Sequence, residues 1–166
     1  MPLTRLLRAA LLACGLFACG AAHALCTLVC SCNVSTTSVA FGSYNPLSAG
    51  HVTSTGNVRV SCGGAAGLAI PVTLTLSAGT SGSMAARQMA SGPRRLNYNV
   101  YVNTAYFNVW GDGSGATLTQ GAWITLNLLG LAPPLDFTVY GRIPGGQSSV
   151  APGAYTDTLV VTLTYF

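Results

Sequence analysis

Four cysteines carry the clearest chemistry of this chain beyond its first 24 residues. Cys26, Cys30, Cys32 and Cys62 form an even set, which is typical of disulfide bonding in an oxidising compartment. Cys32 stands at the start of the first predicted strand and Cys62 at the end of the second, so we predict a Cys32–Cys62 disulfide, with Cys26 and Cys30 as a possible second pair. Zinc is the alternative, although the Cys-x3-Cys-x-Cys spacing fits no common zinc module and no histidine of residues 25–166 lies near it.

Side chains for catalysis are few. Residues 25–166 contain one histidine, His51, and three aspartates, Asp112, Asp136 and Asp157. A Ser-His-Asp arrangement needs its three members within hydrogen-bond reach, and nothing in the spacing of these residues indicates that. We therefore expect a protein that is not an enzyme, with no catalytic residue, metal or cofactor, and we expect His51 to face solvent or lie at a strand end.

Two further segments have the composition of ligand-binding loops. Residues 111–115 (GDGSG) resemble a phosphate or calcium loop, but a phosphate loop needs a helix after it and calcium needs more oxygen ligands. A glycine-rich hairpin turn after Trp110 is predicted instead. Arg142, in the segment GRIPGG, has the chemistry to bind an anion, but we expect it to pair with an aspartate or to donate to backbone carbonyls at a strand end.

The first residues read as a targeting segment. Arg5 and Arg8 precede an apolar stretch over residues 9–19, and residues 22–24 (AHA) form a small-x-small cleavage site. We predict a signal peptide over residues 1–24 and one domain over residues 25–166. A lipoprotein signal that acylates Cys19 is the alternative. The apolar stretch is shorter than the about 20 residues that a membrane span needs.

Charge is scarce after residue 24. Five arginines and three aspartates remain, with no lysine and no glutamate, whereas glycine, serine, threonine, alanine, valine and leucine dominate. A nucleic-acid-binding domain would present a lysine- and arginine-rich face, so nucleic acid is not expected as a partner. A charge-poor, threonine-rich composition suits an exported all-β protein.

Alternation of apolar and polar residues predicts short strands with glycine- and proline-containing turns between them. The predicted strands cover residues 34–41, 51–62, 70–76, 87–89, 96–102, 123–131, 135–143 and 155–166. Several short strands at near-regular spacing favour a β-sandwich or barrel.

The last predicted strand suggests how such a sandwich binds a partner. Its apolar face carries Leu159, Val161, Leu163 and Tyr165, and the opposite face is mostly threonine. We expect a sandwich that stops on a strand of this kind to lack its closing strand. The unpaired edge and the apolar groove beside it would then accept a strand from another chain.

Six segments, in order, resemble the spore coat protein U domain family. They are residues 39–47 (VAFGSYNPL), 58–62 (VRVSC), 96–101 (LNYNVY), 109–113 (VWGDG), 139–147 (VYGRIPGGQ) and 153–159 (GAYTDTL). The family includes subunits of archaic chaperone–usher pili. The resemblance implies an incomplete immunoglobulin-like β-sandwich that lacks its closing strand, with a periplasmic chaperone, an outer-membrane usher and other pilus subunits as partners.

The same resemblance implies a function and a location. Such subunits pass through the periplasm to the cell surface, where the pili mediate adhesion and biofilm formation; the alternative is a self-standing exported coat or a surface- or glycan-binding domain. Subunits of chaperone–usher systems often have a penultimate aromatic residue, here Tyr165, and a glycine fourteen positions from the end, here Gly153. Both are expected to serve chaperone pairing.

The N-terminal segment departs from the pattern of polymerising subunits, which carry a donor segment of alternating apolar residues. Here residues 25–31 precede Cys32, and Cys26, Leu28 and Cys30 alternate in that short stretch. The sequence leaves open whether this segment donates a strand. A tip subunit, a terminal subunit and a domain that does not polymerise are the alternatives.

Overall fold

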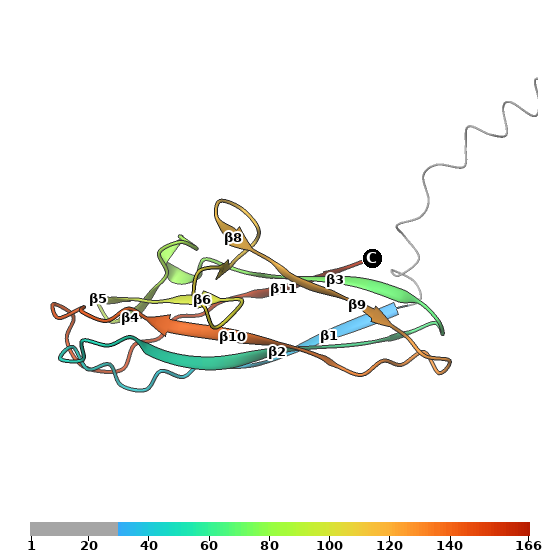
Figure 1. Ribbon diagram of the computed structural model, residues 1–166, viewed down its shortest axis with the longest axis horizontal. Coiled ribbons are helices and arrows are strands. Elements are labelled where there is room, and N and C mark those ends of the chain that lie inside the picture. The colour runs from blue at the N-terminus through green and yellow to red at the C-terminus, as the bar shows by residue number, and fades with distance from the viewer. Residues whose placement is uncertain (1–29) are drawn as a thin grey trace, which may run out of the picture.

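Strands make up nearly all regular structure in residues 30–166, the part of the chain that the computed structural model describes (Figure 1). The strands of this part are β1 (Cys30–Thr37), β2 (Val52–Gly64), β3 (Ala69–Leu76), β4 (Gln88–Ser91), β5 (Arg94–Asn97), β6 (Asn99–Tyr101), β7 (Val109–Trp110), β8 (Thr117–Leu118), β9 (Gln120–Thr125), β10 (Leu135–Ile143) and β11 (Val161–Tyr165), with a 3-10 turn, η1, at Gly79–Ser81. The predicted signal peptide and Cys26 lie outside the described residues.

The strands form two layers that run along the long axis of the molecule (Figure 1). One sheet has the order β1-β2-β10-β6-β7-β8 and the other the order β11-β3-β9, while β4 and β5 form a separate hairpin. The pairs in both sheets are antiparallel except β7–β8. The described residues are therefore an all-β, immunoglobulin-like sandwich with open sheets, as predicted.

The core lies between the two sheets, because alternate residues of each strand point inward. β3 shows the pattern clearly, with Ile70, Val72, Leu74 and Leu76 buried and the residues between them partly or fully exposed. Trp110 of β7 is fully buried, and its indole Nε1–H donates to the carbonyl oxygen of Leu74 at 3.3 Å, which joins the two layers. Other buried residues of the core include Val58, Val60, Val100, Ile124, Val139 and Ile143.

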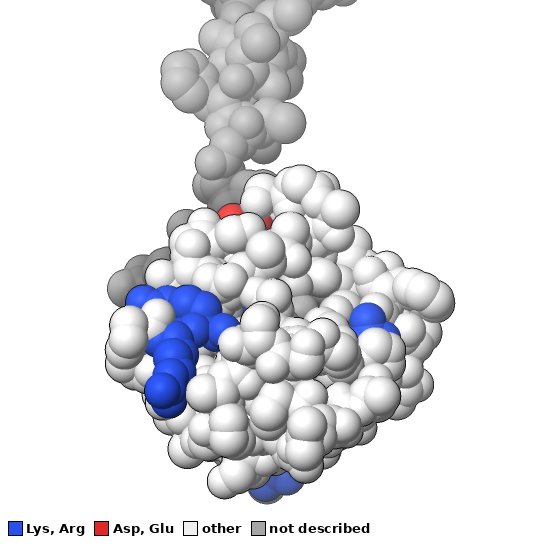
Figure 2. All heavy atoms as spheres, turned by 90° about the vertical axis from the view of Figure 1, so that its left-hand side faces the viewer, with Lys and Arg blue, Asp and Glu red and all other residues white. Residues whose placement is uncertain are grey.

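Charged side chains are sparse on the surface of this sandwich. Figure 2 shows that most of the end that carries the β4–β5 hairpin is uncharged, with a few arginines and little acidic surface. The ion pair of the described residues joins Arg59 to Asp136 at 2.8 Å. Hydrophobic packing and backbone pairing therefore dominate the stability of the fold.

The structure corrects the first predicted strand, residues 34–41. β1 is Cys30–Thr37, and the following segment crosses the sheet instead of continuing the ladder. Gly56 and Gly141 make this crossing possible: a Cβ at Gly141 would lie 2.5 Å from a methyl of Val39 and 2.6 Å from the ring of Phe41. Two glycines on neighbouring strands thus provide the space in which this segment lies.

The predicted strand over residues 123–131 is also wrong in its second half. β9 ends at Thr125, and Asn127 starts a turn in which its side-chain oxygen accepts hydrogen bonds from the backbone N–H groups of Leu129 and Leu131. Gly130 takes a positive φ of 70° in this turn. Local asparagine and glycine turn chemistry overrides the apolar pattern here.

Two other predicted strands are interrupted. Residues 96–102 divide at Tyr98 between β5, which pairs with β4, and β6, which pairs with β10 and β7. In residues 155–166 the strand is limited to Val161–Tyr165. Thr156 forms an isolated bridge with Ala90, so the chain crosses from the β4–β5 hairpin to β3 before β11 begins.

The glycine-rich residues 111–115 do not form a hairpin turn. They connect β7 to β8, which pair in parallel, and these two short strands were not predicted. Asp112 accepts a hydrogen bond from the N–H of Ser114 at 2.8 Å, and Thr117 donates to the carbonyl oxygen of Ser114 at 2.8 Å. The loop is thus held by its own side chains.

Candidate functional site

Within residues 30–166 four strands lie at sheet edges, β1 and β8 in one sheet and β11 and β9 in the other, and the edges of β1 and β11 concern us here. β1 pairs with β2 alone, and β11 pairs with β3 alone. Each edge therefore leaves a row of backbone N–H and C=O groups available to a further strand. β1 belongs to one sheet and β11 to the other, and residues 36–39 at the end of β1 line one pocket together with Leu159 and Val161, so these two open edges border the same interior.

Apolar side chains line both edges and are half-buried. On β11 and the residues before it, Leu159, Val161, Leu163 and Tyr165 all point toward the core and stay partly exposed, whereas Val160, Thr162 and Thr164 face solvent. On β1, Cys32 and Val34 have the same half-buried character. We call the space between β1 and β11 the edge groove.

A pocket of about 190 Å³ opens at the end of the edge groove where β1 finishes. Leu159 and Val161 line it, whereas Leu163 and Tyr165 lie farther along β11 and do not. Its other walls are residues 36–39, Phe41, Asn57, Val58, Leu76, Tyr98, Val100, Val139 and Asp157. The groove is thus deepest where the chain before β11 meets the end of β1.

Asp157 and Tyr98 form a polar network in the wall of this pocket. The Tyr98 hydroxyl donates to Asp157 Oδ2 at 2.7 Å, while the backbone N–H and hydroxyl of Thr80 and the N–H of Thr158 donate to Oδ1. Burial by itself would raise the pKa of Asp157, but these hydrogen bonds lower it below its ordinary value. Burial raises the pKa of Tyr98 well above its ordinary value.

Sequence reasoning missed this network. The signal available was an aspartate within an otherwise apolar and threonine-rich terminal segment, TDTLVVTLTYF. A charged residue in such a position requires partners, but the residue that donates most directly, Tyr98, lies 59 positions earlier.

Arg87 is a second residue that the sequence did not reveal. Its side chain is fully buried, and its guanidinium donates to the carbonyl oxygens of Ser77 and Trp110 and to Asn99 Oδ1 at 2.7 to 2.8 Å. Burial lowers its pKa. One side chain thus ties the end of β3 to β6 and β7, beside the segment that leads into β11.

The predicted Gly153 does not lie in the edge groove. Its N–H and C=O both bond to the backbone of Tyr44, at 3.2 and 2.8 Å. Its φ of 144° lies in the region that favours glycine, which accounts for the residue type. A role in chaperone pairing is therefore not apparent from its position and stays a prediction.

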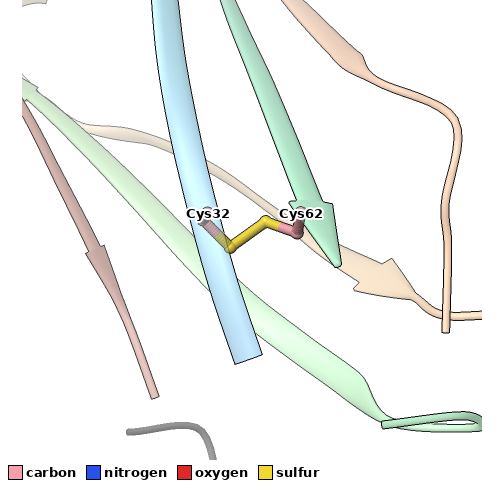
Figure 3. Close-up of a disulfide and its surroundings, with 2 residues drawn as sticks. All are labelled: Cys32 and Cys62. Carbon is pink, nitrogen blue, oxygen red and sulfur yellow. A yellow bond between two sulfur atoms is a disulfide. The ribbon is translucent and has the colours of Figure 1, made fainter. Parts of the chain in front are cut away.

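A disulfide joins β1 to β2 beside the groove (Figure 3). Cys32 and Cys62 are directly opposite in the antiparallel register, with Cα atoms 4.1 Å apart. The bond fixes the strand that forms one wall of the groove. The second pair, Cys26 and Cys30, involves a residue outside the described part of the chain.

The other candidate residues are dispersed. The imidazole Nδ1 of His51 accepts a hydrogen bond from the N–H of Gly145 at 3.0 Å, at the start of β2, so its strand-end position is confirmed. Asp136 bonds to Arg59 and Asn57, and these bonds hold its pKa at about 2. Within residues 30–166 no group of three histidine, cysteine or acidic side chains is arranged for a metal.

Arg142 caps a backbone carbonyl, one of the roles that its sequence position suggested. Its Nη2 donates to the carbonyl oxygen of Tyr106 at 3.4 Å. The guanidinium carbon lies 5.2 and 4.9 Å from the ring centroids of Tyr101 and Tyr106, which adds cation–π attraction.

In the described residues, no helix has the length and hydropathy needed to cross a membrane.

Three matches with known proteins describe what this chain is similar to. The model of the Spore Coat Protein U domain matches residues 18–162. Protein U of Myxococcus xanthus is 31% identical over 134 residues, which cover 75% of this chain and 70% of that protein.

The third match is a solved structure, the CsuC-CsuE chaperone–tip adhesion subunit pre-assembly complex from archaic chaperone–usher Csu pili of Acinetobacter baumannii. One of its chains matches with a TM-score of 0.52 and 20% identity, over 81% of this chain and 39% of that chain. This chain thus spans about two fifths of the length of the chain that it matches, and the likeness is one of fold.

Proposed function

Because the chain belongs to the Spore Coat Protein U domain family, we propose that it is a structural, non-catalytic subunit of a chaperone–usher surface pilus. Assembly would proceed by donor-strand complementation: a periplasmic chaperone lends a strand to the edge groove, and the N-terminal segment of the next subunit replaces it at an outer-membrane usher. The functional domain is residues 25–166, exported through the periplasm after loss of residues 1–24.

The observation that carries this proposal is the pair of open edges with half-buried apolar rows. A strand laid along β11 would satisfy the backbone groups of that edge. Its apolar side chains would cover Leu159, Val161, Leu163 and Tyr165, which the described residues leave partly exposed. Burial of such a side chain from full exposure is worth roughly 1.5–3 kcal/mol, and these half-buried side chains would each gain a part of that, so the added strand would stabilise the domain.

Donor rescue tests the proposal. Residues 25–166 are expressed in a periplasm with and without the candidate chaperone, and soluble yield and Tm are measured with and without a synthetic peptide of alternating apolar residues. We expect low yield for the chain alone and a rise in yield and Tm with chaperone or peptide. Leu163→Asp should abolish the rescue because it places a charge on the apolar side of the groove.

Thr164→Asp is the matched control, since Thr164 is the next residue of β11 and faces solvent. It should be rescued like the unmodified chain. A chain that is soluble alone, unfolds cooperatively and ignores the peptide would overturn the proposal. It would favour the self-standing exported coat or surface- or glycan-binding domain.

The N-terminal cysteines decide whether this subunit can itself donate a strand. In an extended strand the Cα atoms of Cys26 and Cys30 would be about 13 Å apart, beyond the limit of about 7 Å for a disulfide. A Cys26–Cys30 bond found by peptide mapping would therefore place the subunit at a tip or make it solitary, whereas free thiols would leave the donor role intact.

Adhesion and biofilm formation would follow from display of such pili at the cell surface. Deletion of the reading frame should reduce attached biomass without slowing planktonic growth. Restoration by the unmodified chain, but not by Leu163→Asp, would tie the phenotype to assembly through the edge groove.

A further inference from the structure

The solvent face of the three-stranded sheet β11-β3-β9 carries a large exposed aromatic residue. Trp123 of β9 is 70% exposed, whereas Trp110, the other tryptophan of the chain, is fully buried. Trp123 points away from the core because its neighbours Ala122 and Ile124 take the inward positions of the strand. An exposed indole contributes nothing to core packing, and it becomes informative when the surface around it forms a patch of defined chemistry.

The strand register places Trp123 at the end of an ordered surface. Trp123 is paired across the sheet with Pro71, and the next outward row is Gly121, Thr73 and Thr164. The row after that pairs Thr75 with Thr162. The rings of Trp123 and Pro71 thus stand beside rows of threonine hydroxyls on one continuous face, which we call the Trp123 face, and Phe166, 56% exposed, follows Thr164 in the outward alternation of its segment.

Gly121, which has no side chain, leaves open space on this face beside the indole. A Cβ at this position would lie 2.7 Å from the carbonyl oxygen of Val72, so the close approach of β9 to β3 requires glycine. The surface between Trp123 and Thr73 is therefore bare backbone. A flat ligand can reach the indole from that side without meeting a side chain.

The Trp123 face is also uncharged. Every outward residue of β3, β9 and β11 is neutral, and none of the arginines and aspartates of the described residues lies on these three strands. Charge complementarity therefore selects a neutral occupant. Stacking on an indole and hydrogen bonding to several hydroxyls require a ligand with a flat apolar face and a hydroxylated edge, and a pyranose ring has both.

We propose that the Trp123 face binds a neutral polysaccharide, with a sugar ring stacked on Trp123 and its hydroxyls bonded to the threonines. This site is separate from the edge groove: on β11, Leu163 points into the groove and Thr164 points to the opposite side. A strand added along the edge would leave the face open, so the inference holds for an assembled subunit and for a self-standing domain alike.

Depletion binding tests the proposal. The full mature chain, in its soluble form with chaperone or donor peptide if it needs one, is mixed with microcrystalline cellulose or chitin, and the unbound protein is measured. We expect saturable binding to at least one of these neutral polymers. Trp123→Ala should weaken it about tenfold or more, because a stacked aromatic anchor dominates such contacts, while Trp123→Tyr should retain most of it.

Two controls separate this site from general surface hydrophobicity. Phe107→Ala removes another aromatic side chain that is 85% exposed, outside this sheet, and should leave binding unchanged. Thr73→Val keeps the shape of the side chain but removes a hydroxyl and should weaken binding by a smaller factor than Trp123→Ala. Soluble oligosaccharides of the bound polymer should shift the tryptophan emission of the unmodified chain and not that of Trp123→Ala.

Three outcomes would overturn the proposal. The first is no binding of the unmodified chain to either polymer, and the second is equal binding by Trp123→Ala. The third is self-association that disappears in Trp123→Ala and is indifferent to polysaccharide, which would assign the face to a second copy of this chain.

Discussion

Loss of the Cys32–Cys62 disulfide should destabilise the domain strongly, because the bond closes a long loop and holds an edge strand. The two cysteines are 30 residues apart in sequence and opposite one another in β1 and β2. Closing a loop of this length lowers the conformational entropy of the unfolded chain, which stabilises the folded state by about 3–4 kcal/mol in the chain-entropy model. For a domain of this size that corresponds to a fall in Tm of about 10 °C.

The Cys32→Ala/Cys62→Ala double variant makes this measurement without leaving an unpaired thiol at either position. Its Tm and its free energy of unfolding in urea are compared with those of the unmodified chain, both at the same concentration of donor peptide or chaperone. Ser31→Ala, on the exposed side of β1, is the control and should change Tm little.

The effect should be larger on the edge groove than on the rest of the sandwich. In the described residues β1 has β2 as its one neighbour, so loosening β1 removes a groove wall while β3, β9 and β10 keep their pairing. Hydrogen exchange of β1 amides should increase more than that of β3 amides. An unchanged Tm in the double variant, or peptide mapping that joins Cys62 to Cys26 or Cys30, would refute the reasoning.

Three further predictions concern residues around the groove and the core. Arg87→Met should lower the free energy of unfolding by about 3 kcal/mol, because it leaves buried carbonyl oxygens without donors. Arg94→Met, at an exposed position of β5, is the control and should change the free energy of unfolding little. Equal effects of the two substitutions in urea melts would contradict the role of Arg87. Gly141→Ala should lower the free energy of unfolding by about 1–3 kcal/mol, because the added methyl group overpacks the contact with Val39 and Phe41. Gly50→Ala is the control and should have little effect, since no atom lies within 4 Å of its added Cβ. An unchanged free energy of unfolding in Gly141→Ala would mean that the segment over β10 moves freely. Tm should fall as pH is lowered from about 4 toward 2. The pKa values of Asp136 (about 2) and Asp157 are lower in the folded protein than in the unfolded chain. Their charged forms therefore stabilise the fold above about pH 4, and this stabilisation is lost when they are protonated. Asp157→Asn should flatten this dependence, and an unchanged slope in that variant would show that the Tyr98–Asp157 network does not contribute.

The sequence alone was sufficient wherever the relevant information is local. Period-two alternation predicted β10 over residues 135–143 at both ends and β3 within one residue, because a strand that buries one face must alternate whatever its partners are. The same alternation identified the inward side of the final segment, with Leu163 half-buried and Thr164 exposed. Family membership was also readable, since ordered motifs cover most of the chain.

Tertiary structure decided where the final strand begins and which groups meet. That strand begins at Val161 because the residues before it cross from the β4–β5 hairpin to β3. The turn of Asn127 and Gly130 that follows β9 is local by contrast, and the apolar residues that continue to Leu131 obscured it in the sequence. Whether the face of Leu163 borders an open edge depends on the strand order, which alternation does not encode. The burial of Arg87 and the contact of Tyr98 with Asp157 likewise require partners 10 to 59 residues away. Tertiary packing brings such residues together, and a local sequence pattern does not predict it.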